Sequence, residues 1–153
     1  MDYYDLPDNK VFLISAKGLV FNQQKQILLL KISDQDHDKK ARLKWDIPGG
    51  LIEIEEDLEK CLIREIKEEC NIKVEVKNLL AINNNWTKGF KFKNGNIKDA
   101  RIFVLGFLCQ YKGGTVKLSI EHEDYRWVNI DQINNYNLIP NARGLIEKAL
   151  KLI

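Results

Sequence analysis

One segment, residues 49–72, constrains the fold more than any other part of the chain, because a glycine pair is followed by residues with helical spacing. Leu58, Leu62 and Ile66 recur four residues apart, so they fall on one face of a helix. We therefore expect a helix over residues 56–70 whose apolar face packs against a core. Because a sheet or further helices must cover that face, the pattern predicts a layered domain.

Three glutamates lie on or beside the apolar face of this helix. Glu65 and Glu69 fall in line with the leucines, and Glu68 lies one step round. Glutamate is rarely buried unless it is paired or binds a metal, and like charges four residues apart repel each other. A hard divalent cation with oxygen ligands is one explanation. The other is a small rotation of the helix that leaves all three carboxylates in solvent, and helical spacing alone does not choose between them.

The spacing of the whole segment favours the metal-binding interpretation. From Gly50 the chain reads glycine, five residues, Glu56, seven residues, Arg64-Glu65-Ile66, one residue, Glu68-Glu69, and then Cys70-Asn71-Ile72. This order resembles the Nudix box, G-x5-E-x7-R-E-U-x-E-E-x-G-U, in which U is a bulky apolar residue. Every specified position matches except the last glycine.

Two residues depart from the family pattern. Asn71 replaces the last glycine of the box, at a position that follows the helix and needs a left-handed conformation. Asparagine is the next-best residue there, so the same helix end is expected. Glu55 stands where relatives usually carry glycine, which affects the backbone of the loop before the helix.

The resemblance extends to most of the chain. Residues 45–50 (WDIPGG) are similar to the family's lead-in to the box, and residues 121–128 (EHEDYRWV) to a later stretch. The family resemblance implies an α/β fold, an α/β/α sandwich with a mixed sheet, over a single domain spanning residues 1–153. It also implies a hydrolase that uses Mg²⁺ or Mn²⁺ and cleaves a nucleoside diphosphate linked to another group.

The resemblance also assigns roles to residues, position by position. Glu65, Glu68 and Glu69 would bind the metal together with the backbone carbonyl of Gly49. Arg64 would orient Glu65, and Glu56 would support the same network. Arg64, Glu65 and Glu68 would form the catalytic group, with Glu68 as a ligand or as the base that activates water.

Two further segments leave alternatives open. Glu121 lies where relatives often place an additional carboxylate, and it is either such a ligand or base, or a solvated loop acid. Residues 88–93 (KGFKFK) mix lysines with phenylalanines. That composition suits nucleic-acid stacking, but a loop that faces a small substrate is the favoured interpretation.

Charge and cysteine content narrow the class of protein. The net charge is +2, from 24 basic and 22 acidic residues, whereas a dedicated nucleic-acid binder has a strong basic excess. Three cysteines outside any zinc spacing indicate reduced thiols in a cytoplasmic protein. The polar start is unlike a signal peptide, and the apolar runs are too short to span a bilayer. We expect a nucleotide-binding monomer or homodimer with no membrane or stable nucleic-acid partner.

The remaining elements are predicted from periodicity and turn residues. Residues 11–14 and 18–21 are apolar stretches around a Lys-Gly break, residues 26–32 and 72–81 are strands, and residues 83–96 are a loop. Residues 101–111 and 115–118 form a hairpin around Gly113-Gly114, followed by a strand at 126–128, a brief helix capped by Asp131, and a helix at 140–150.

Substrate choice depends on residues outside the box. ADP-ribose hydrolases of the family tend to carry a proline downstream of it, and here none occurs between Pro48 and Pro140. Dinucleoside-polyphosphate hydrolases tend to carry a tyrosine where this chain has Phe90. A nucleoside triphosphate therefore remains the first expectation, with ADP-ribose or a nucleotide-sugar as the alternative. A non-catalytic nucleotide sensor is disfavoured, because it is expected to lose box carboxylates that this chain retains.

Overall fold

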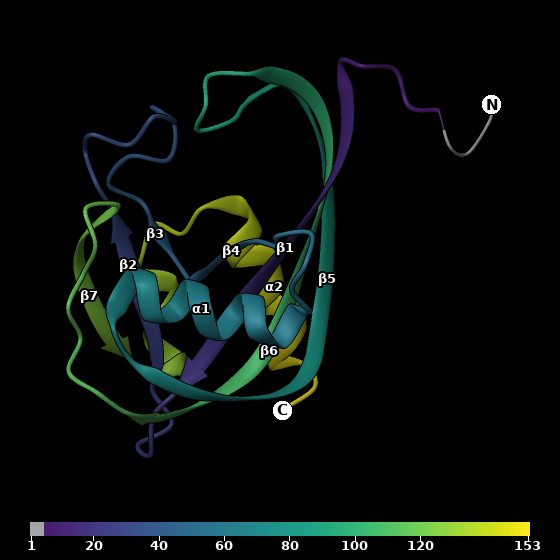
Figure 1. Cartoon of the computed structure of the whole chain (residues 1–153). Helices are drawn as coiled ribbons and strands as arrows, with labels where there is room; N and C mark the ends of the chain where they lie inside the picture. Colours follow the sequence, from purple (N-terminus) through teal and green to yellow (C-terminus); the bar gives the residue numbers. More distant parts are fainter. Residues whose placement is uncertain (1–4) are drawn as a thin grey trace.

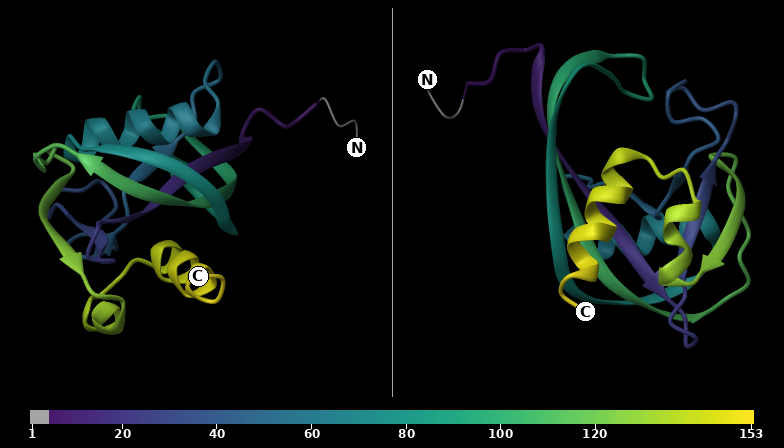
Figure 2. Two further views of the ribbon diagram at one scale, coloured as in Figure 1. Left: turned by 90° about the horizontal axis from the view of Figure 1, so that it is seen from below. Right: turned by 180° about the vertical axis from the view of Figure 1, so that it is seen from behind.

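A mixed β-sheet lies between two helical layers in the structure, a computed structural model that describes residues 5–153 (Figures 1 and 2). The strands are β1 (Lys10–Phe21), β2 (Ile27–Ile32), β3 (Trp45–Asp46), β4 (Gly49–Leu51), β5 (Lys73–Lys91), β6 (Ile97–Gly113) and β7 (His122–Val128). The helices are α1 (Leu58–Cys70), the 3-10 helix η1 (Ile130–Asn135) and α2 (Pro140–Leu150).

The sheet combines parallel and antiparallel pairs. Strands β3, β2, β1, β6 and β5 lie side by side in that order, while β4 pairs with β1 and β7 pairs with β2. Strands β1 and β6 are parallel, and the other pairs are antiparallel. The predicted α/β sandwich with a mixed sheet is confirmed.

Each face of the sheet has its own hydrophobic core. Alternate side chains of a strand point to opposite faces, so Leu28 and Leu30 pack under α1 while Leu29 packs under α2. All three leucines are fully buried, which explains why this strand reads as a continuous apolar run. Figure 2 shows α1 on one side of the strands and α2 on the other.

Helix α1 begins and ends as its local sequence dictates. The Asp57 side chain accepts a hydrogen bond from the Lys60 N–H at 2.8 Å, so the helix begins two residues later than predicted. Leu62 and Ile66 are fully buried, which confirms the predicted apolar face. Asn71 ends the helix in the left-handed conformation with φ 61°, as expected from its place in the box.

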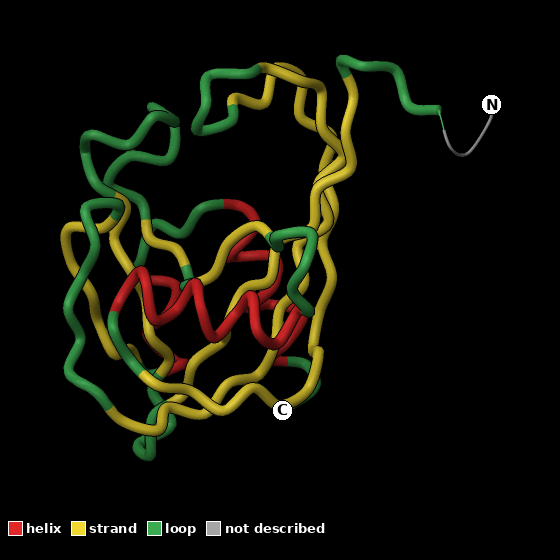
Figure 3. Tube along the Cα trace, in the orientation of Figure 1, coloured by secondary structure: helices red, strands yellow, loops and turns green. Residues whose placement is uncertain are grey.

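The predicted loop over residues 83–96 is wrong in most of its length. Strand β5 continues to Lys91 and pairs with β6, leaving only a short turn before Ile97 (Figure 3). Strand pairing uses backbone groups, so a polar run such as residues 83–85 can extend a strand whose side chains are partly exposed. The prediction gave too much weight to asparagine as a loop former.

The hairpin predicted around Gly113-Gly114 is also wrong, because residues 115–118 form no strand. Both glycines adopt positive φ values and direct the chain towards the end of α1. There the Lys117 N–H donates to the Cys70 carbonyl and the Ser119 N–H to the Glu69 carbonyl. This segment therefore satisfies the free carbonyls at the helix end.

The other predicted elements differ in smaller ways. Strand β1 runs unbroken through Lys17 and Gly18, and α2 spans the predicted residues. Asn129, not Asp131, occupies the position before η1, and Asp131 lies in the first turn. Residues 1–4 of the polar start lie outside the described residues. From residue 5 onwards, no helix is long and apolar enough to cross a membrane.

Candidate active site

Arg64 is the centre of a partly buried ion-pair cluster beside α1. Its Nε and Nη2 donate to both oxygens of Glu56 at 3.0 and 2.6 Å, a two-point contact. Its Nη1 donates to Glu65 at 2.9 Å and to Glu68 at 3.2 Å. Three of the predicted site glutamates are therefore held by one guanidinium group, which has the planar shape for such contacts.

The arginine also fixes the ionisation of Glu56. Hydrogen bonds from Arg64 lower the pKa of Glu56 to about 2, and the two carboxylates beside it raise the pKa of Arg64. Glu56 also accepts the Glu53 N–H at 3.0 Å and so closes the turn that precedes the helix. Glu55, the departure from the family pattern, is exposed in this turn and has no positive φ.

The chain bends at Pro48 and enters β4 through Gly49 and Gly50. This stretch, called the glycine turn below, brings Glu65 and Glu69 to one place. The Gly49 N–H donates to Glu69 at 3.3 Å. A Cβ atom at Gly50 would lie 2.5–2.8 Å from the Glu65 carboxylate, and one at Gly49 would lie 2.0 Å from the Ala16 carbonyl oxygen. Gly49 is therefore required by the backbone of β1, whereas a side chain at Gly50 would displace the Glu65 carboxylate from its place against the backbone.

The two carboxylates beside this turn lie in surroundings that disfavour negative charge. Burial raises the pKa of Glu69 to about 8, and the side chain is 6% exposed. Burial also raises the pKa of Glu65, although Arg64 opposes the shift. A buried carboxylate with a raised pKa needs a nearby positive charge to ionise at neutral pH.

Lys17 of β1 and Asp46 of β3 form a second ion pair below this turn. The Lys17 Nζ lies 2.9 Å from Asp46 Oδ2, and it also donates to the carbonyls of Ile47 at 3.3 Å and Gly49 at 3.5 Å. Burial alone lowers the pKa of Lys17, but Asp46, Glu69 and Glu65 together raise it, so the lysine stays charged. The pair anchors the backbone that carries the glycine turn.

The sequence analysis missed this pair. A signal was present, because lysine in a strand that is otherwise apolar is rarely buried without a partner. The partner was not identifiable, since Asp46 lies 29 residues away in the sequence. Only the register of β1 against β4, in which Lys17 pairs with Gly49, brings the lysine to the turn.

Replacing Lys17 with methionine is expected to lower the free energy of unfolding by about 3 kcal/mol, since it leaves the buried Asp46 carboxylate without its partner. The additional change Asp46→Asn should recover most of this loss, because both charges are then absent. Urea unfolding of the two variants and the wild type measures the effect. A single variant as stable as the wild type would show that the pair does not anchor the turn.

Glu121 lies in the segment that contacts the end of α1, since the Ser119 N–H, two residues before it, donates to the Glu69 carbonyl at 2.9 Å. The charge of Glu121 is a minor cause of the raised pKa of Glu65 and Glu69. Its Oε1 lies 3.5 Å from the Nζ of Lys93, at the tip of the β5–β6 hairpin. The loop acid and the tip of the hairpin therefore border the same site.

The donor groups beside the glycine turn suit a hard divalent cation. Among residues 5–153, no three His, Cys, Asp or Glu side chains meet as a ready metal-binding group. The Glu69 carboxylate accepts the Gly49 N–H, the Glu65 carboxylate lies against Gly50, and the backbone between these two contacts carries the Gly49 carbonyl. Two carboxylates and a carbonyl are oxygen ligands of the kind that Mg²⁺ and Mn²⁺ prefer.

Comparison with known proteins agrees with the box and with the fold. The NUDIX domain family model matches residues 12–149. A MutT-like protein of Streptomyces ambofaciens is 28% identical over 121 residues, which cover 79% of this chain and 66% of that protein. Nucleoside triphosphatase NudI of Escherichia coli is 31% identical over 114 residues, covering 71% of this chain and 75% of that protein.

A solved structure gives the same result in three dimensions. The crystal structure of a MutT protein from Methanosarcina mazei Go1 aligns with a TM-score of 0.74 and 27% identity, over 94% of this chain and 96% of that one. The family match runs through nearly every element from β1 to α2. The chain therefore belongs to the Nudix hydrolase family.

Proposed function

We propose that the protein is a metal-dependent pyrophosphohydrolase that cleaves a nucleoside triphosphate between the α and β phosphates, releasing a monophosphate and pyrophosphate. The observation that carries this proposal is the placement of Glu69 at the Gly49 N–H and of Glu65 against Gly50, which brings two carboxylates to one short stretch of backbone. Nudix hydrolases generally use divalent metal ions, and this arrangement supplies oxygen ligands for one.

Glu65, Glu69 and the Gly49 carbonyl are the proposed metal ligands, with Glu68 beside them. A bound Mg²⁺ would neutralise the phosphates and lower the pKa of the attacking water. The buried position of Glu69 gives a direct reason for such an ion, because the charge of Lys17 only partly offsets the effect of burial on the pKa of this carboxylate. Lys17 and Asp46 hold the glycine turn in place while the ligands are engaged.

Glu68 is the proposed base. Its side chain is 59% exposed, so it can reach a water molecule, and its contact with Arg64 restricts where the carboxylate lies. In the proposed reaction the water oxygen bonds to the α or the β phosphorus, and one of its protons passes to the Glu68 carboxylate. The P–O bond that bridges the α and β phosphates breaks, and the departing phosphate group leaves as an anion with the electron pair. Arg64 holds Glu56, Glu65 and Glu68 in position through its ion pairs.

Three observations support a triphosphate as the substrate. The sequence lacks the downstream proline of ADP-ribose hydrolases and the tyrosine of dinucleoside-polyphosphate hydrolases. Two of the related proteins are named as MutT-like and as a nucleoside triphosphatase. The lysine-rich hairpin tip borders the site and suits a substrate with several phosphates.

Chromatography of reaction products tests the substrate assignment. Purified protein with Mg²⁺ is incubated with each (deoxy)nucleoside triphosphate, an oxidised guanine triphosphate and ADP-ribose. We expect monophosphate and pyrophosphate from at least one triphosphate. Faster cleavage of ADP-ribose than of every triphosphate would replace the triphosphate assignment with the ADP-ribose alternative, and no cleavage of any compound would favour a nucleotide sensor.

A further inference from the structure

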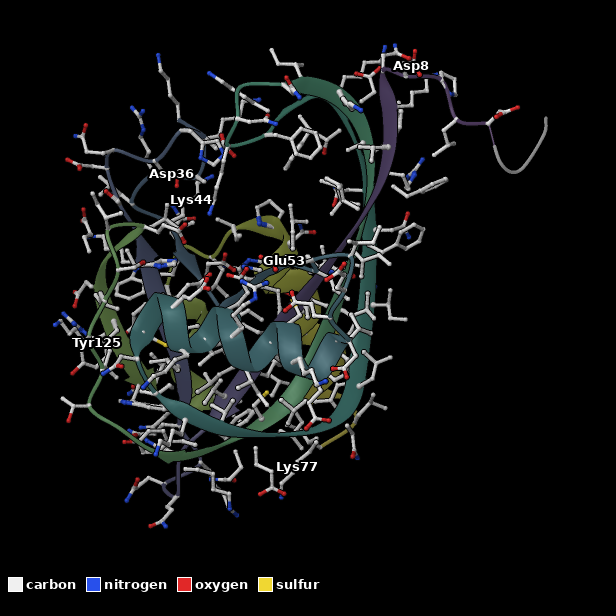
Figure 4. All side chains as sticks on the ribbon, viewed as in Figure 1. Asp8, Asp36, Lys44, Glu53, Lys77 and Tyr125 are labelled. Atoms are coloured by element: carbon white, nitrogen blue, oxygen red, sulfur yellow. The ribbon has the colours of Figure 1, made fainter. Side chains whose placement is uncertain are left out.

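A basic pocket lies between the β5–β6 hairpin tip and the loop that follows β2. Its volume is about 510 Å³, and both segments lie at the end of the molecule where Asp36 and Lys44 are labelled (Figures 1 and 4). The loop contributes His37, Asp38, Lys39 and Lys40, and the hairpin contributes Thr87, Lys88, Gly89, Phe90 and Lys91. Four lysines and one aspartate give the lining a formal charge of +3 with histidine neutral.

The four lysines have no acidic partner in the described part of the chain. None of them takes part in an ion pair among residues 5–153. Lysines gathered in this way repel one another, so the pocket favours any anion that enters it.

The described carboxylates near these lysines accept hydrogen bonds from backbone N–H groups and form no ion pair with the four lysines. Asp36 accepts the Asp38 N–H, and Asp38 accepts the Lys40 N–H, each at 3.0 Å. On the hairpin, Asp99 accepts the Gly89 N–H at 3.0 Å. These acids shape the two segments, and the ammonium groups remain available for a ligand.

A series of contacts links the pocket's hairpin to the helix that carries the carboxylates. Lys93, two residues beyond the last pocket lysine, contacts Glu121 at 3.5 Å. Ser119, two residues before Glu121, donates its N–H to the backbone carbonyl of Glu69 at 2.9 Å. The hairpin that carries Lys88 and Lys91 is therefore linked to the end of α1 that carries Glu69.

We propose that this pocket is a phosphate-binding subsite, which holds the phosphates of the substrate that lie beyond the cleaved bond. It rests on the proposed function, because it assigns a place to the terminal phosphates of a triphosphate. Lys39, Lys40, Lys88 and Lys91 form charge-assisted contacts with phosphate oxygens, which select long phosphate chains over ADP-ribose. Phe90 lines the same pocket and packs edge-on against Phe92 with ring centroids 5.1 Å apart, which stiffens the tip.

Binding of tripolyphosphate in EDTA, measured by isothermal titration calorimetry, tests the subsite without any turnover. The wild type should bind it, and Lys88→Gln/Lys91→Gln should bind about tenfold more weakly. The matched control Lys67→Gln/Lys73→Gln removes the same charge from exposed positions near the end of α1, and it should bind within about twofold of the wild type. The four substituted lysines, two in each variant, are exposed, so both variants should melt at the wild-type temperature.

Three outcomes would overturn the subsite: no binding to the wild type, equal weakening in the control, or no change in Lys88→Gln/Lys91→Gln. Tighter binding of a single-stranded oligonucleotide than of tripolyphosphate, lost in the same variant, would instead assign the pocket to nucleic acid. Hydrolysis without tripolyphosphate binding refutes only the subsite, whereas binding without hydrolysis refutes only the proposed reaction. If the wild type both binds tripolyphosphate and hydrolyses the triphosphate, Lys88→Gln/Lys91→Gln should raise KM for the triphosphate and retain kcat.

Discussion

Glu65→Gln and Glu68→Gln should each lower kcat by about two orders of magnitude or more, while the protein stays folded. Both substitutions keep the size of the side chain and remove its charge. Glutamine at position 65 removes a proposed anionic metal ligand, whose carboxylate lies against Gly50. Glutamine at position 68 removes the proposed base. Steady-state kinetics with a triphosphate and Mg²⁺ measure both effects.

Glu59→Gln is the matched control for these variants. Glu59 is also an exposed glutamate of α1, but it lies in the first turn and outside the Arg64 cluster. Its kcat should equal that of the wild type. Thermal melting of all three variants separates a loss of chemistry from a loss of fold. Wild-type rates in folded Glu65→Gln and Glu68→Gln would refute the assigned roles.

Removal of divalent metal should abolish hydrolysis completely. The negative charge of the phosphate oxygens disfavours attack by the lone pair of a water molecule, and a bound divalent cation would neutralise that charge. Arg64 cannot neutralise the substrate, because its donors are already bound to glutamates. Pyrophosphate release is measured in EDTA and again after addition of excess Mg²⁺ or Mn²⁺.

The added metal should restore the full rate, which excludes irreversible damage by the chelator. Ca²⁺ should restore less of the hydrolysis rate than Mg²⁺ or Mn²⁺, since it accepts more ligands at longer distances and fits a small oxygen site poorly. Full activity in metal-free buffer would contradict the proposed mechanism, even if the substrate assignment were right.

The helix and its carboxylates were predictable because their signals are local. Helical spacing placed Leu62 and Ile66 in the core, and Glu69 beside them, as the structure shows. The cap at Asn71 follows from the chemistry of a single position. The resemblance to the Nudix box then added roles for residues whose periodicity alone was ambiguous.

Features that depend on distant parts of the chain were not predictable in this way. The Lys17–Asp46 pair requires β1, β3 and β4 to meet, and no local pattern contains that information. The extension of β5 to Lys91 depends on β6 being available to pair with a polar segment. The basic pocket likewise joins two segments about 50 residues apart, so it emerges only when the hairpin folds over the loop.

The position of a bound metal ion tests the central claim most directly. Crystals of the protein grown or soaked with Mn²⁺ can be measured by anomalous diffraction, which locates the ion independently of any activity. We predict an anomalous peak within about 2–2.5 Å of carboxylate oxygens of Glu65 and Glu69 and of the Gly49 carbonyl oxygen. A Mn²⁺ ion bound elsewhere, or no ion at this turn at saturating Mn²⁺, would contradict the assignment of these residues as the metal centre.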